Sequence, residues 1–352
     1  MASSVFDHPW LGGLFADPEM ADTWSPERSL AHMIAFEAAW SRALGACGLA
    51  PAKEAEAAAS AIEASTIEPA DLREGTGQDG LPVPQLVKLL RTHAGNDAVH
   101  TGATSQDVID TALVLTLRAN SDLVQSRIER LQAALSTLEA RFGDAPLMGR
   151  TRMQAATPIT VRDRVQTWRL PLEAHASRLV ELRPRVEVVQ VGGASGDRAA
   201  LGDHGQRMAD GMAQSFDLRS PEKAWHAMRE GIVDYASFLS LLSGSLGKMG
   251  QDMVLMAQQG IDEIALSGGG GSSAMPHKHN PIQAELLVTL ARFNAVQVSG
   301  MHQALVHEQE RSGAAWALEW MILPQMAQAT GRALCVALAL CEKVERMGTL
   351  KA

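Results

Sequence analysis

Aromatic side chains are scarce in this chain of 352 residues. They make up 4% of the sequence and include a single tyrosine, whereas apolar residues as a whole make up 46%. Strands are usually enriched in aromatic and β-branched residues, while alanine, leucine, glutamate and arginine favour helices. The scarcity therefore favours a helical protein over one built from sheets.

Cysteine is rarer still, and the sequence has no long apolar run. Cys47, Cys335 and Cys341 are odd in number and lie at none of the spacings typical of a metal site. The apolar run 333–340 is far shorter than the roughly 20 residues that span a bilayer. The first residues do not place an apolar stretch after basic ones, as a secretory signal does. We expect a cytoplasmic protein with reduced thiols, no membrane partner, no metal and no cofactor.

Basic residues are outnumbered. Lysine and arginine total 31 against 40 acidic residues, which gives a formal net charge of −9. A general nucleic-acid binder would show a basic face. No nucleic-acid partner is therefore expected.

Long helical stretches dominate what is present. Residues 108–142 contain neither glycine nor proline, and Val124, Ile128 and Leu131 belong to an apolar stripe at helical spacing. Strands are hard to find: residues 186–191 have β-branched character, but they lie in a helical context. Five long helices with short connections predict an all-α bundle. The stretches are 108–142, 158–191 with Pro171 and Pro184 inside, 221–264, 281–309, and 314 almost to the end across Pro324.

The first third of the chain is more broken. Ser25-Pro26-Glu27 predicts a helix start, with the helix running to about Gly45, and an alanine-rich helix follows Pro51. Residues 75–80 and 95–106 are expected to be loops on either side of a short helix over 85–93. We expect an N-terminal helical domain over residues 1–105 and a central bundle domain over residues 106–352.

The long helix is apolar on a second side near its start, at Leu113, Val114, Leu115 and Leu117. A helix that is apolar on more than one side is usually buried on more than one side. This pattern favours an oligomer whose core is the bundle domain. A monomer with a thick core is the alternative.

The most distinctive segment is Ser267-Gly-Gly-Gly-Gly-Ser-Ser-Ala-Met-Pro-His-Lys-His-Asn-Pro281. Four glycines in a row favour neither helix nor strand and predict a loop. Backbone N–H groups beside the two serines, together with the start of a helix after the proline, could bind an anion. The alternative is a plain surface linker, which would not need the residues that follow the serines.

This segment resembles the signature Gly-Ser-Ser-x-Met-Pro-x-Lys-x-Asn-Pro of the fumarase/aspartase superfamily at every fixed position. Residues 100–111, His-Thr-Gly-Ala-Thr-Ser-Gln-Asp-Val-Ile-Asp-Thr, resemble a second superfamily motif. Residues 149–158, Gly-Arg-Thr-Arg-Met-Gln-Ala-Ala-Thr-Pro, occupy the place of a third. Within the superfamily the chain is most similar to the bacterial 3-carboxy-cis,cis-muconate cycloisomerases, through residues 100–107, 192–202, 221–226, 244–248 and 307–312.

Two departures from the superfamily pattern matter. Arg152 stands where fumarases and adenylosuccinate lyases carry a histidine, which the cycloisomerase branch also lacks. The chain also stops where relatives usually begin a third, C-terminal helical domain. We therefore expect a bundle of the fumarase/aspartase type without that third domain.

The resemblance implies an intramolecular lyase that interconverts 3-carboxy-cis,cis-muconate, a small tricarboxylate, and 4-carboxymuconolactone in protocatechuate (β-ketoadipate) catabolism. It implies a homotetramer in which His100, Gln154 and Ser272 meet from different chains. Ser272 would transfer the proton, with Lys278 stabilising its alkoxide. The remaining expected site residues are His100 as a catalytic group and, for substrate binding, Thr104, Ser105, Gln106, Arg150, Arg152, Gln154, Ser273, Asn280, Arg311 and Ser312.

Several alternatives stay open. His100 could cap the long helix or line a wall instead of touching substrate. Asp107 and Asp110 are interpreted as ordinary acids of that helix's first turn. For the whole chain, the alternatives are another superfamily lyase, such as adenylosuccinate or argininosuccinate lyase, and a helical scaffold that has lost catalysis.

Overall fold

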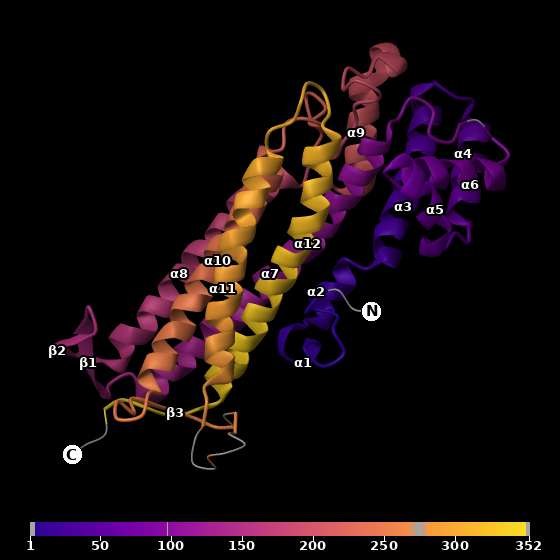
Figure 1. Cartoon of the computed structure of the whole chain (residues 1–352). Helices are drawn as coiled ribbons and strands as arrows, with labels where there is room; N and C mark the ends of the chain where they lie inside the picture. The colour runs from indigo at the N-terminus through magenta and orange to yellow at the C-terminus, as the bar shows by residue number, and fades with distance from the viewer. Residues whose placement is uncertain (1–3, 97, 269, 272–274, 276–278, 350–352) are drawn as a thin grey trace.

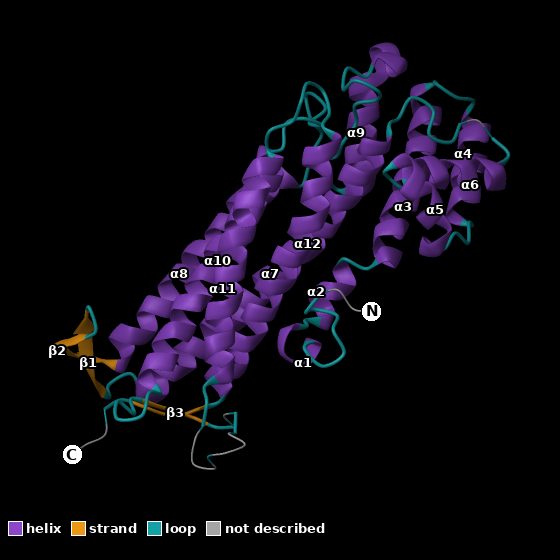
Figure 2. Ribbon diagram, in the orientation of Figure 1, coloured by secondary structure: helices purple, strands orange, loops and turns teal. Residues whose placement is uncertain are grey.

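A computed structural model describes residues 4–96, 98–268, 270–271, 275 and 279–349 of the chain. Its centre is a bundle of five long helices that lie side by side (Figure 1). Figure 2 shows that helices and connecting loops make up most of the described chain, so the predicted all-α class is confirmed. The bundle helices are α7 (Ser105–Phe142), α8 (Val161–Val186), α10 (Glu230–Met256), α11 (Ile282–Ala304) and α12 (Gly313–Glu342).

Shorter helices gather near one end of the bundle, which we call the head end (Figure 1). There α3 packs against α4, α7 and α9, while α1 and α2 lie further along the bundle. These elements are α1 (Gly12–Phe15), α2 (Pro18–Thr23), α3 (Pro26–Cys47), α4 (Ala52–Glu63), the 3-10 helix η1 (Pro69–Leu72), α5 (Arg73–Asp79), α6 (Val83–Ala94), the 3-10 helix η2 (Ala199–His204) and α9 (Gly205–Phe216).

Two small two-stranded antiparallel sheets mark the opposite end, which we call the tail end (Figures 1 and 2). One pairs β1 (Pro146–Thr151) with β2 (Gln154–Thr160), and the other pairs β3 (Ile264–Leu266) with β4 (Val344–Met347). The connection between α7 and α8 is therefore a hairpin, which the sequence did not predict.

The start of α7 is fixed by its own sequence. Thr104 precedes the helix in an extended conformation, and its backbone N–H donates to Asp107 Oδ2 at 3.0 Å. This is half of a capping box, which satisfies backbone donors that a helix leaves open at its N-terminus. The helix then runs for 38 residues, or about 57 Å at 1.5 Å per residue.

The buried apolar side chains form two cores. The larger core lies along the bundle and includes Leu117 to Leu138 of α7 and much of α10 and α12. The smaller core lies at the head end, where α3 to α6 and the first turns of α7 meet residues 189–218. The division into domains at residues 105 and 106 stays a prediction. Among the described helices, none is long and apolar enough to cross a bilayer.

Some predicted boundaries were wrong. Residues 75–80, predicted as a loop, lie mostly in α5. Gly75 lets this helix approach α6 closely, because a Cβ at this position would lie 2.5 Å from Gln85 Cβ. The helix expected over 158–191 ends at Val186, because the backbone beyond it pairs with Arg219. The helix expected over 221–264 begins only at Glu230, and that expected over 281–309 ends at Ala304.

Candidate active site

Three of the predicted substrate-binding residues meet at the head end. Arg311, in the loop between α11 and α12, donates from Nε to Gln106 Oε1 at 2.9 Å and from Nη2 to Thr104 Oγ1 at 3.2 Å. Gln106 is fully buried, and its amide nitrogen donates to the carbonyl of His226 at 3.0 Å. We call Thr104, Gln106, Asp107, His226 and Arg311 the head cluster.

Asp107 is the centre of the head cluster. Its Oδ1 lies 2.9 Å from His226 Nε2, and its Oδ2 accepts the backbone N–H of Gly193 at 2.9 Å as well as that of Thr104. Both Asp107 and His226 are buried. The carboxylate therefore ties the start of α7 to the glycine-rich turn after residue 191.

A second buried charge network lies behind the head cluster. Arg229 contacts Asp110 and Glu319, with nitrogen–oxygen distances of 2.7 and 2.5 Å, and all three side chains are almost fully buried. Burial alone would lower the pKa of Arg229, but the attraction of Asp110 and Glu319 outweighs it and raises that pKa. The guanidinium also lies 4.9 Å from the Trp225 ring centroid. Arg229 thus stays charged and holds α7, α10 and α12 together.

His100 lies on the loop that leads into α7. Its Nδ1 is 2.6 Å from Glu37 Oε1 of α3, and its side chain retains 14% exposure. Ser105 is the first residue of α7, and buried Ser312 accepts the backbone N–H of Ala315 at 3.2 Å as the N-cap of α12. His307 is also close by: burial and then Arg229 lower the pKa of its imidazole.

The other predicted residues that the structure describes lie at the tail end. Arg150 in β1 donates to the buried Glu263 Oε1 at 2.6 Å. Arg152 and Met153 form the turn of the β1–β2 hairpin with φ values of 51° and 66°, in the left-handed region. Gln154 opens β2 and is exposed. The hairpin thus presents Arg152 and Gln154 at the surface.

The described residues at the base of the glycine-rich signature segment also lie at the tail end. Gly270 and Asn280 exchange two backbone hydrogen bonds of 3.0 and 2.9 Å, which close the base of the segment just before α11. A cavity of about 460 Å³ adjoins this base, lined in part by His279, Asn280 and Lys343. Ser272, Ser273 and Lys278 lie outside the described residues.

Within one chain, the two groups of predicted residues are far apart. Thr104 precedes the first residue of α7, and the β1–β2 hairpin follows its last residue, so about 57 Å of helix separates them. Figure 1 shows the hairpin and the start of α11 at the end opposite to α3–α6 and α9. One subunit alone brings Thr104, Gln106 and Arg311 together, but not with Gln154 or Asn280.

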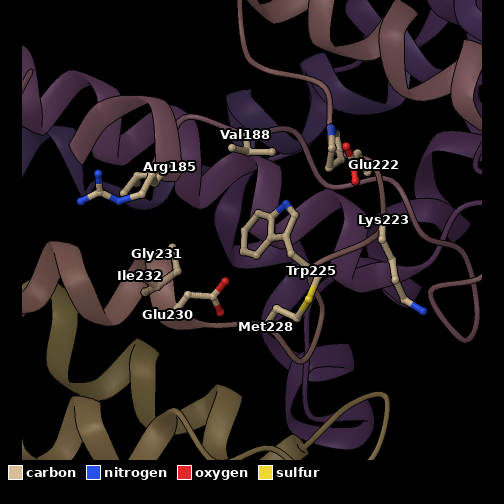
Figure 3. Close-up of a pocket in the computed structure, with 11 residues that line it drawn as sticks. Arg185, Val188, Glu222, Lys223, Trp225, Met228, Glu230, Gly231 and Ile232 are labelled. Carbon is tan, nitrogen blue, oxygen red and sulfur yellow. The ribbon is translucent and has the colours of Figure 1, made fainter. Parts of the chain in front are cut away.

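A separate cavity of about 400 Å³ lies between the end of α8 and the start of α10. Figure 3 shows Trp225 at its centre, with Met228 and Glu230 below the indole and Lys223 to one side. None of the predicted site residues lines this cavity. We therefore do not assign the reaction to it.

Sequence reasoning missed the acids at the start of α7. Asp107 and Asp110, interpreted as ordinary first-turn acids, are both fully buried and paired. It also missed Glu37, Arg229 and Glu319. A charged residue next to apolar residues in the sequence can indicate a buried charge. That signal does not identify its partner far along the chain.

Comparisons with known proteins fit this arrangement. The family model described as Lyase matches residues 15–300. A 3-carboxy-cis,cis-muconate cycloisomerase of Pseudomonas aeruginosa is 38% identical over 98% of this chain and 76% of its own length. The crystal structure of a 3-carboxy-cis,cis-muconate lactonizing enzyme from Pseudomonas putida superposes with a TM-score of 0.89, at 36% identity over 96% of this chain and 77% of that one.

A lyase of different specificity is also related. The N-acetyl-S-(2-succino)cysteine lyase of Enterococcus italicus is 31% identical over 93% of this chain and 73% of its own length. The family match spans most of the chain, and the signature segment, the long-helix bundle and the head cluster agree with it. The chain therefore belongs to the lyase family of the fumarase/aspartase superfamily.

Proposed function

We propose that this chain interconverts 3-carboxy-cis,cis-muconate and 4-carboxymuconolactone in the protocatechuate (β-ketoadipate) route. The observation that carries the proposal is the similarity to named cycloisomerases over nearly the whole chain. Arg152, in the place of a lyase histidine, suits a substrate with an additional carboxylate. A cytoplasmic location belongs to the same proposal.

The reaction does not need a nucleophilic side chain from the protein. A carboxylate of the substrate adds to its own double bond, so the protein has to hold the diene in the folded geometry that brings the two together. It also has to bind three carboxylates, stabilise the aci-carboxylate intermediate and deliver a proton to carbon. Cations held in a site that excludes most of the water stabilise the negative charge that develops during the reaction.

Eight of the thirteen predicted residues then have a proposed role. Arg311 binds one carboxylate by a charge-assisted hydrogen bond from Nη1, because Nε and Nη2 already donate to Gln106 and Thr104. Thr104 and Gln154 supply further donors, and Arg150 and Arg152 add positive charge from the hairpin. Ser272 transfers the proton while Lys278 stabilises the serine oxygen, and Asn280 donates to a carboxylate oxygen.

These roles require a homotetramer whose sites join head and tail ends of different subunits. The hairpin supports this proposal, because Met153 is 72% exposed and residues 154–158 of β2 are exposed. An isolated two-stranded hairpin is only marginally stable in water. Contact with a neighbouring subunit would cover the hairpin and bring Gln154 to a head cluster.

A substrate panel tests the proposed activity. The protein is incubated separately with 3-carboxy-cis,cis-muconate, N-acetyl-S-(2-succino)cysteine and adenylosuccinate. Loss of the conjugated diene's ultraviolet absorbance, with formation of the lactone, is expected for the first compound only. Turnover of either other compound without diene loss would overturn the assignment.

A further inference from the structure

Glu37 has no role in the chemistry described so far, yet its position is unusual. Its side chain is fully buried in α3, and Oε1 lies 2.6 Å from His100 Nδ1. Its second oxygen, Oε2, is buried without a hydrogen-bond partner among the described residues. A buried carboxylate with an unsatisfied oxygen costs free energy that an apolar residue would avoid. Packing alone therefore does not explain a glutamate here.

The loop that carries His100 is held at three consecutive residues. Arg91 donates from Nε and Nη2 to the carbonyl of Val99 at 3.2 and 3.0 Å, and Trp40 Nε1 donates to the carbonyl of Thr101 at 2.9 Å. Between them, His100 has a φ of 63°, in the left-handed region. A non-glycine residue persists there when its surroundings impose the conformation, and such residues gather at functional sites.

The contact with Glu37 also determines where the histidine carries its proton. An ionised carboxylate can only accept, so Nδ1 must be the donor in this pair. In the neutral ring, Nε2 is then the unprotonated acceptor. The His100 side chain retains 14% exposure, and it lies on the loop that ends at Thr104 of the head cluster.

We propose that Glu37 is the positioning residue of His100. By accepting the Nδ1–H, the buried carboxylate fixes the ring in one tautomer and presents Nε2 as a hydrogen-bond acceptor to the substrate or its proton donor. In lactone opening, a hydroxyl hydrogen-bonded to Nε2 gives its proton to the ring as it takes one from the substrate carbon, and the same carboxylate stabilises the resulting imidazolium. The effect of Glu37 on catalysis rests on the proposed function, whereas its effect on the tautomer of His100 does not.

The tautomer is measured without substrate by magic-angle-spinning NMR of the full chain labelled with ¹⁵N-histidine. The His100 signals are identified as those missing from His100→Gln. In the neutral ring we expect the proton on Nδ1 and none on Nε2, and a loss of this preference in Glu37→Gln. A proton on Nε2 in the unmodified protein would overturn the inference, even if 3-carboxy-cis,cis-muconate proved not to be the substrate.

Steady-state kinetics tests the consequence. Glu37→Gln should lower kcat by about 10²-fold, as expected for loss of an acid–base group, and change KM by less than about threefold. The double variant Glu37→Gln/His100→Gln should be no slower than His100→Gln alone, because Glu37 acts through His100. Effects that multiply instead would contradict a positioning role.

Ser41→Ala is the matched control. Ser41 is also buried in α3 and donates to the backbone carbonyl of Glu37 at 3.0 Å. This variant removes a buried hydrogen bond from the same turn without touching the carboxylate, so its kcat should be unchanged. If Glu37→Gln fails to fold by circular dichroism, the tautomer of the unmodified protein still decides the inference.

Discussion

Arg311 is held in place by hydrogen bonds within the protein and can still contact a ligand. Its Nε and Nη2 donate to Gln106 and Thr104, which fixes the plane of the guanidinium. We expect Nη1 to meet a substrate carboxylate. Arg311 as a whole is half-buried at the head cluster, so part of it is open to a ligand.

Arg311→Lys tests this dual role. Lysine keeps the charge but loses the planar fork that reaches protein and ligand together. We expect kcat/KM to fall by about 10²-fold, mostly through KM, with an unchanged circular dichroism spectrum. Arg42→Lys, in an exposed ion-pair cluster with Glu56 and Glu63, serves as the control and should leave KM unchanged. An unaltered KM in Arg311→Lys would contradict the assignment.

The buried network around Arg229 predicts a large effect on stability. Arg229→Met would leave Asp110 and Glu319 buried without their cation. We expect the free energy of unfolding to fall by about 3–5 kcal/mol in urea titrations. Asp22→Asn, which breaks the exposed pair with Arg28, should cost less than about 1 kcal/mol. Equal losses of unfolding free energy in the two variants would show that burial does not determine how much these ion pairs contribute to stability.

These networks also show what local sequence pattern cannot reveal. Asp110 meets Arg229 across 119 residues, and Glu319 meets Arg229 across 90. An acid in the first turn of a helix has an ordinary explanation through the helix dipole. Only the packing of α7 against α12, with Arg229 just before α10, distinguishes Asp110 from such an acid.

At the scale of helices and strands, the apolar stripe was the reliable signal. The spacing of Val124, Ile128 and Leu131 predicted α7 correctly. In the structure all three side chains lie on one side of the helix and are fully buried. The β1–β2 hairpin escaped prediction because β2 is almost wholly exposed and lacks alternation between buried and exposed residues. Helix α5 escaped because Gly75 reads as a loop signal, whereas here it permits close packing with α6.

The contact between α8 and α10 predicts a pH dependence of stability. His175 of α8 lies 2.9 Å from Ser245 Oγ of α10, and its Nδ1 accepts from Arg178. Burial, and then Arg178, lower the pKa of His175 to about 4. As the pH falls from about 6.5 to 4, the unfolded chain takes up a proton that the folded chain refuses, so stability is lost over this range.

Urea titrations at pH 7 and pH 5 measure this contribution. In His175→Gln, the loss of stability between the two pH values should be smaller than in the unmodified protein by about 1–2 kcal/mol, allowing for partial solvent screening. His93→Gln, at the exposed end of α6, provides the control and should leave the loss unchanged. An identical pH dependence in all three proteins would contradict the assigned protonation of His175.

At the scale of the whole molecule, the motifs could be recognised in the sequence but their separation could not. Residues 100–111 and 149–158 are close along the chain, yet α7 places them at opposite ends of the bundle. The helix length follows from the absence of glycine and proline in residues 108–142. We propose that contact between subunits brings the motifs together, and no pattern within one chain defines such a contact.

Mixing two inactive variants tests this central claim most directly. Ser272→Ala and Arg311→Ala, each expected to be inactive alone, are co-expressed with different tags, and oligomers that carry both tags are purified. If each site takes Ser272 and Arg311 from different subunits, about one quarter of the sites receive both intact residues by chance, and about a quarter of the normal rate of diene loss should return. If both residues come from the same subunit, every site lacks one of them, and hybrids that remain inactive would contradict the account.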